Sequence, residues 1–123
     1  MTAEGPTLVG TKGVVDGEVF ALKYGHSLVI GRSRSCDISL RKCPRWLEAE
    51  SEGKTPGEAA STVSRKHLKI TYHDPNSIEL EDLSSNGTFV DGRRIDRLVL
   101  TDVQETSHEI VLGGGETFRI EWR

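Results

Sequence analysis

The sequence contains few residues that could cross-link the chain or hold a structural metal ion. Its 123 residues include only two cysteines, Cys36 and Cys43. Two are too few for a disulfide framework or a structural zinc site, so we expect both to be reduced thiols. No apolar run approaches the length of a membrane helix, and the first residues lack the basic and apolar regions of a secretory signal. We therefore expect a cytoplasmic or otherwise intracellular protein without metal, cofactor or membrane contact.

Net positive charge and a set of aromatic residues for stacking are also lacking. The net charge is −3, from 16 Lys and Arg against 19 Asp and Glu, and aromatic residues make up only 6%. Both features argue against a nucleic-acid binder. The charge is unevenly distributed, however. Between Gly31 and Trp46 a single acid, Asp37, faces five basic residues: Arg32, Arg34, Arg41, Lys42 and Arg45. A locally positive surface on an acidic protein suits a small anionic ligand better than a polyanion.

The length fits one domain, spanning residues 1–123, and the hydrophobic pattern indicates β-structure almost throughout. Apolar and polar residues alternate in residues 67–73, so we expect the even positions to face a core and the odd ones, His67 included, to face away. Turn signals such as Asn86-Gly87 and Asp91-Gly92 punctuate similar short runs. The sequence therefore predicts an all-β, antiparallel sandwich of about ten or eleven short strands.

One polar segment, residues 41–61, interrupts this pattern. Within it, residues 44–50 can form one or two helical turns, because Pro44 suits a first helical position, and residues 51–60 are typical of a flexible loop. The segment also contains Trp46 and Leu47. They either pack the insert onto the sandwich or form a secondary contact surface for a partner.

Three short motifs lie where strands give way to turns: Gly31-Arg32-Ser33, Ser64-Arg65-Lys66-His67 and Ser84-Ser85-Asn86-Gly87-Thr88. Each alone has an ordinary explanation as a surface arginine, a packing histidine or a tight turn. Each also offers donors that suit a phosphate or a peptide backbone. A guanidinium binds phosphate oxygens in a bidentate manner, and a side-chain amide both donates and accepts hydrogen bonds.

In this order and spacing, the motifs resemble those of the forkhead-associated (FHA) domain, a reader of phosphothreonine in proteins. The resemblance covers about residues 19–123, with the insert at 41–61 outside it. It implies a β-sandwich whose binding loops lie at one end. It departs from the family at Ser107-His108-Glu109, where many members have a Gly-Asp pair, and this leaves the strand boundaries there open.

The resemblance also implies roles for individual residues. Three would contact the phosphate, namely Arg32, Ser64 and Ser85. Two would contact the peptide backbone, namely Asn86 and Arg65. Four would support the loops structurally, namely Gly31, His67, Gly87 and Thr88.

The predicted function is therefore binding of a phosphothreonine-containing protein, such as a Ser/Thr kinase substrate in the same chain or complex, without catalysis. The alternative is a phosphate-independent interaction scaffold with the same fold. A hydrolase using Ser64 and His67 is less favoured, because residues three apart at a turn into a strand are poorly placed to pair as nucleophile and base. No other catalytic motif is present in the sequence.

Overall fold

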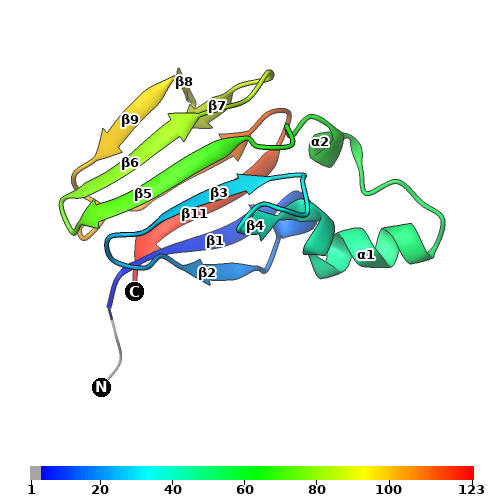
Figure 1. Ribbon diagram of the computed structural model, residues 1–123, viewed down its shortest axis with the longest axis horizontal. Coiled ribbons are helices and arrows are strands. Elements are labelled where there is room, and N and C mark those ends of the chain that lie inside the picture. The colour runs from blue at the N-terminus through cyan, green and yellow to red at the C-terminus, as the bar shows by residue number, and fades with distance from the viewer. Residues whose placement is uncertain (1–3) are drawn as a thin grey trace.

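The computed structural model describes residues 4–123 as two β-sheets packed face to face (Figure 1). In spatial order the six-stranded sheet consists of β2 (Val19–Ala21), β1 (Pro6–Lys12), β11 (Glu116–Trp122), β10 (His108–Leu112), β7 (Thr88–Val90) and β8 (Arg93–Ile95). The five-stranded sheet consists of β4 (Ile38–Ser39), β3 (Ser27–Gly31), β5 (Leu68–Asp74), β6 (Ser77–Asp82) and β9 (Arg97–Leu100). All pairs are antiparallel except β3 with β4, which is parallel. The predicted sandwich of about ten or eleven strands is confirmed.

The core lies between the sheets and follows the predicted alternation along β5. Leu68, Ile70 and Tyr72 are buried and Lys69 is exposed. The expectation that His67 faces away is wrong, because its side chain is fully buried. His67 precedes the regular strand, so its direction is set by hydrogen bonds to neighbouring loops and not by the pleat.

Strand β1 extends the sandwich beyond the predicted boundary of about residue 19. It lies between β2 and β11, with Leu8 fully buried and paired with Phe20 on one side and Ile120 on the other. Its sequence includes Pro6 and Gly10, which by themselves favour turns. The strand forms because two neighbours pair with it, which no local pattern reveals.

The insert forms three short helices, η2 (Leu40–Lys42), α1 (Pro44–Ser51) and α2 (Glu58–Ser61), at one end of the sandwich (Figure 1). Helix α1 begins at Pro44 as expected, whereas α2 lies in a region expected to be loop. The two apolar residues differ: Trp46 is 7% exposed within the core cluster, and Leu47 is 48% exposed.

Strand β10 begins at His108, within the segment whose strand boundaries were left open. The imidazole lies between two carboxylates, with Nδ1 2.5 Å from Asp91 Oδ2 and Nε2 2.6 Å from Asp102 Oδ1. Burial lowers the pKa of His108, but the hydrogen bonds to both carboxylates outweigh it and hold the pKa above its ordinary value.

Within residues 4–123 both cysteines are buried free thiols. No helix among these residues is long and apolar enough to cross a membrane.

Candidate functional site

The three sequence motifs meet at one end of the sandwich, where β3 ends and β5 begins. The backbone N–H of Arg32 donates to the Ser64 carbonyl at 3.0 Å, and that of Ser33 donates to the Arg65 carbonyl at 3.1 Å. These bonds continue the pairing of β3 with the chain ahead of β5. They fix the first two motifs against each other before any side chain is considered.

Gly31 permits this close approach. A Cβ at this position would lie 2.1 Å from the Arg65 carbonyl oxygen. No heavy atoms pack so closely, so any larger residue would displace the Arg65 backbone. The glycine is therefore required by the contact between the end of β3 and the segment before β5, and not by a special backbone angle.

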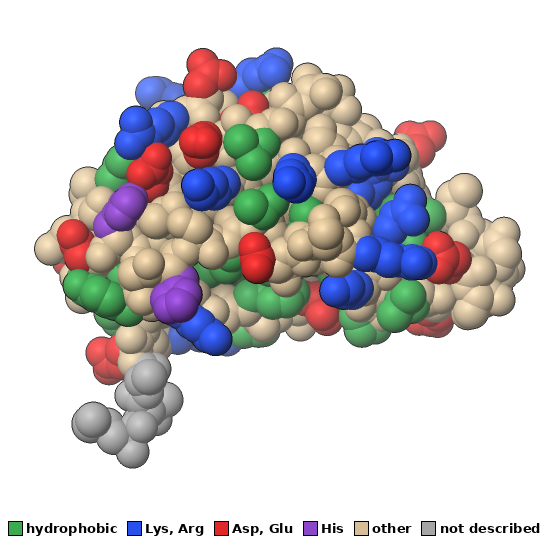
Figure 2. Space-filling model, in the orientation of Figure 1, with side chains coloured by type: hydrophobic (Ala, Val, Ile, Leu, Met, Phe, Trp, Pro, Cys, Tyr) green, Lys and Arg blue, Asp and Glu red, His purple; other side chains and the backbone are tan. Residues whose placement is uncertain are grey.

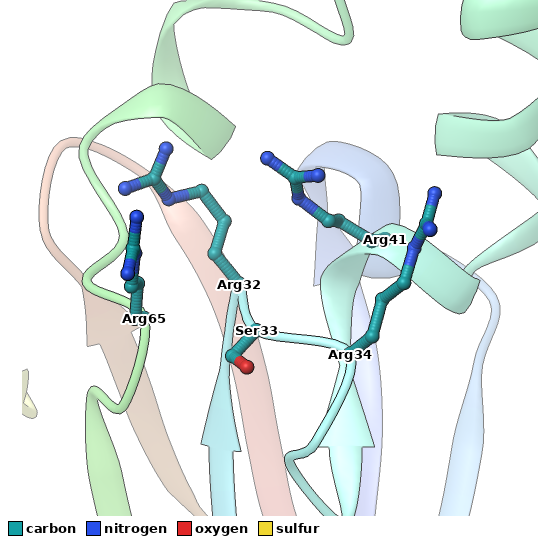
Figure 3. A pocket seen from close by; sticks show the side chains of 5 residues that line it. All are labelled: Arg32, Ser33, Arg34, Arg41 and Arg65. Carbon is teal, nitrogen blue, oxygen red and sulfur yellow. The ribbon is translucent and has the colours of Figure 1, made fainter.

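A cavity of about 300 Å³ opens beside these loops, lined by Arg32, Ser33, Arg34, Arg41 and Arg65 (Figure 3). None of its four arginines has an acidic side chain within 4.0 Å among residues 4–123. Figure 2 shows Lys and Arg side chains gathered toward the end of the molecule that carries α1 and α2. The cavity therefore has a concentrated positive charge that suits an anion.

The Arg32 side chain is anchored at one point and free at its tip. Its Nε–H donates to the Val63 carbonyl at 2.8 Å, and the side chain is half-buried. The bond orients the guanidinium plane, and both terminal nitrogens are without a hydrogen-bond partner among residues 4–123, so they can bind a ligand. A guanidinium held this way loses less conformational entropy when it binds.

Ser64 and Ser85 are joined directly. The backbone N–H of Ser85 donates to Ser64 Oγ at 3.1 Å. Because Ser64 Oγ accepts this bond, its own hydroxyl hydrogen remains available to donate. Neither serine lines the cavity, so they lie beside the arginine-lined space and not within it.

His67 links the second motif to the third. Its Nδ1 accepts the backbone N–H of Ser64 at 3.0 Å, so Nε2 carries the proton and donates to the Gly87 carbonyl at 2.8 Å. Burial lowers the pKa of His67, and the bond to Gly87 only partly opposes this. The neutral ring thus holds two loops together.

Asn86 reaches across to the same segment. Its Nδ2 donates to the Thr62 carbonyl at 2.8 Å while the residue stays exposed. The amide retains its oxygen and a second N–H for other partners. Residues 62–65 thus accept hydrogen bonds from Arg32, Ser85 and Asn86.

The turn behind Asn86 is fixed by its own hydrogen bonds. Gly87 has φ +95° and donates its N–H to Ser84 Oγ at 2.8 Å. Asp82 accepts from the hydroxyls of Ser84 at 2.6 Å and Thr88 at 2.9 Å. Positive φ at Gly87 explains why glycine follows the asparagine.

Sequence reasoning missed two contributors to this site. Thr62 accepts Asn86 through its carbonyl, and its Oγ1 accepts the Gly114 N–H at 2.7 Å, which ties in the β10–β11 turn. Arg41 enters the cavity from the insert, and only the basic run between Gly31 and Trp46 hinted at it. Among residues 4–123 no group of His, Cys, Asp and Glu side chains is arranged to hold a metal ion.

Comparison with known families decides the classification. The FHA domain model matches residues 28–113, which is more than half of the chain. The chain belongs to the FHA domain family. FHA domains are protein-interaction modules, and the match includes all three loop motifs and the insert.

Solved structures agree in fold over nearly the whole chain. The FHA domain of the CT664 protein from Chlamydia trachomatis is 26% identical with a TM-score of 0.66, covering 94% of this chain and 95% of that one. The FhaA FHA domain complexed with the intracellular domain of Rv3910 is 26% identical with a TM-score of 0.63, covering 97% and 100%. An FHA domain solved in work on phosphothreonine-dependent FHA interactions is 28% identical with a TM-score of 0.62, covering 96% and 94%. A search of the curated proteins found no match.

Proposed function

We propose that this FHA domain binds phosphothreonine in partner proteins through the loops at the end of β3 and the start of β5. The observation that carries the proposal is the free tip of Arg32 at a cavity of about 300 Å³ with no acidic partner among residues 4–123. A phosphate carries about −1.5 to −2 charges and three acceptor oxygens. It would neutralise Arg32 and use the donors beside it.

The phosphate contacts are assigned to three residues. Arg32 supplies a bidentate guanidinium. Ser64 Oγ accepts the Ser85 N–H and supplies its own hydroxyl hydrogen to the phosphate. Ser85 supplies its hydroxyl. Asn86 and Arg65 are assigned to the peptide main chain, because both are exposed and each directly follows a serine assigned to the phosphate. Gly31, His67, Gly87 and Thr88 hold these loops in place.

Related structures support the proposed class of ligand. One FHA domain of 28% identity comes from work on phosphothreonine-dependent interactions, and another of 26% identity was solved with the intracellular domain of Rv3910 as its partner. We extend that type of interaction to this chain. Its partner would be an intracellular protein that a Ser/Thr kinase has phosphorylated. This phosphorylated segment would belong to the same chain or to another protein of the same complex.

The competing functions fit the geometry less well. A phosphate-independent scaffold would favour an Arg32 locked in an internal ion pair, but among residues 4–123 the Arg32 guanidinium has only a backbone carbonyl as partner. A hydrolase would need His67 to accept the Ser64 hydroxyl proton, but Nδ1 accepts the Ser64 backbone N–H instead. We therefore expect binding without turnover.

The first test is Arg32→Ala measured by calorimetry with a phosphothreonine peptide. Charge-assisted hydrogen bonds contribute about 1.5 to 3 kcal/mol each. Loss of the guanidinium should therefore weaken binding at least about tenfold. Arg32→Lys should restore the affinity only in part, because an ammonium cannot bind two oxygens in one plane.

Lys66→Ala is the matched control, since Lys66 is exposed and does not line the cavity. It should leave the affinity within about twofold of the unmodified protein. Unphosphorylated peptide should not bind, and phosphoserine peptide should bind more weakly. Equal affinity for Arg32→Ala and the unmodified domain would contradict the proposal.

A further inference from the structure

The cavity contains more positive charge than one phosphate can neutralise. Its lining includes four guanidinium groups, from Arg32, Arg34, Arg41 and Arg65. A phosphothreonine brings about −1.5 to −2 charges, so about two positive charges remain. None of these guanidinium groups has an acidic partner within 4.0 Å in residues 4–123. Like charges that share a cavity repel one another unless a ligand neutralises them.

The four side chains fall into two pairs. In Figure 3, Arg32 and Arg65 rise on one side of the opening, Arg34 and Arg41 start on the other side, and the Arg41 guanidinium extends toward Arg32. The first pair comes from the β3 end and the segment before β5, which are hydrogen-bonded to each other. The second pair comes from the β3–β4 loop and from η2 of the insert. The cavity therefore has guanidinium donors beyond the contacts assigned to the phosphate at Arg32.

Arg41 is held in place by the insert. Its guanidinium carbon lies 5.5 Å from the centroid of the Trp46 ring, and Trp46 is itself buried. Stacking on an aromatic ring orients a guanidinium without neutralising it. Arg41 is also half-buried, so its charge is partly shielded from water and interacts more strongly with a ligand.

We propose that Arg34 and Arg41 form a second anion subsite, which binds another negative group of the same peptide while Arg32 holds the phosphothreonine. This rests on the proposed function and adds the class of ligand: a peptide with phosphothreonine and a second anion. The second group is a second phosphate or a carboxylate. Both present oxygens that a guanidinium binds in a bidentate manner.

The test uses phosphothreonine peptides in two series. In one series a second phosphothreonine is placed at successive positions on either side of the first, and in the other a glutamate is placed there. The reference peptide has a single phosphothreonine and neutral flanks. Calorimetry compares the unmodified domain with Arg34→Gln/Arg41→Gln. The control is Arg93→Gln, because Arg93 is exposed on β8 outside the cavity.

The unmodified domain should bind the best doubly anionic peptide at least tenfold more tightly than the reference, a gain of about 1.4 kcal/mol. The double variant should lose this gain and keep the affinity for the reference peptide within about threefold. Arg93→Gln should retain the gain. A gain only from phosphate assigns the subsite to a second phosphate, and an equal gain from glutamate assigns it to a carboxylate.

Three results would overturn the subsite. If second anions change nothing while Arg32→Ala still weakens binding at least about tenfold, the subsite is wrong and the proposed function stands. If the gain persists in Arg34→Gln/Arg41→Gln, the extra charge is bound elsewhere. If no phosphorylated peptide binds the unmodified domain, the proposed function fails and the subsite falls with it.

Discussion

At the scale of single residues, His67 connects the fold to the binding loops. Its Nδ1 accepts the Ser64 N–H and its Nε2–H donates to the Gly87 carbonyl, and the first of these bonds requires a neutral ring. Protonation would put a hydrogen on Nδ1, opposite the Ser64 donor. The position of Ser64, and through it that of Ser85, therefore depends on the protonation state of a fully buried histidine.

This arrangement predicts the direction of a pH effect on stability. Burial lowers the pKa of His67 in the folded state below its ordinary value of 6.5. Below about pH 6.5 the unfolded chain therefore binds a proton that the folded chain does not, and stability falls as the pH decreases through the lowered pKa. Denaturant unfolding of the unmodified domain and of His67→Gln, measured across this range, should show this loss only with histidine present.

His108 must be separated from this effect, because its pKa is raised by the Asp91 and Asp102 hydrogen bonds against the effect of burial. Its contribution is present below pH 6.5 and is lost as the pH rises through the raised pKa. The difference between the unmodified domain and His67→Gln cancels the His108 contribution. A difference that does not change with pH would contradict the assignment of His67 as a neutral buried ring.

At the scale of elements, the insert is part of the core and also lines the site. Trp46 of α1 lies in the core cluster at 7% exposed, whereas its neighbour Leu47 is 48% exposed. Of the two roles open for these residues in the sequence, packing therefore applies to Trp46. Leu47 remains on the surface beside the basic residues of the insert.

The adjacent pair allows a matched test of the insert. Trp46→Ala should lower the free energy of unfolding by about 3 to 5 kcal/mol, because a large buried ring is lost. Leu47→Ala should change it by less than about 0.5 kcal/mol. Thermal and urea unfolding measure both. Equal effects from the two substitutions would mean that α1 does not pack as described.

The sequence predicts an element when local residue patterns determine it, and does not when contacts with distant residues determine it. Alternation in residues 67–73 and the turn signals are local, and they predict β5 and its neighbours correctly. The burial of His67 and the pairing of β1 depend on partners far away in the sequence. The alternation of apolar and polar residues therefore predicts the wrong direction for the His67 side chain and does not predict β1. Arg41 entered the cavity by the same kind of long-range arrangement, which the charge run suggests but cannot position.

At the scale of the whole molecule, strand β1 joins β2 to the rest of the six-stranded sheet of the sandwich that carries the binding loops. The main chains of Gly5 and Arg123 exchange hydrogen bonds at 2.8 and 2.9 Å, and β1 continues this pairing along β11. Val14 and Val15, which follow β1, donate their N–H groups to the buried Glu116 carboxylate. Burial raises the pKa of Glu116, and these donors oppose that effect.

Removal of residues 1–12 should therefore prevent cooperative folding of the entire domain. It would expose one edge of β11, leave β2 without its partner and remove the fully buried Leu8. Folded domains are stable by only about 5 to 15 kcal/mol, and loss of one buried leucine side chain alone costs about 2 to 5 kcal/mol. Removal of residues 1–4 is the control, because it leaves β1 intact. Circular dichroism during heating should show a sharp transition for the control and none for the longer truncation, and a sharp transition in both would show that β1 is dispensable.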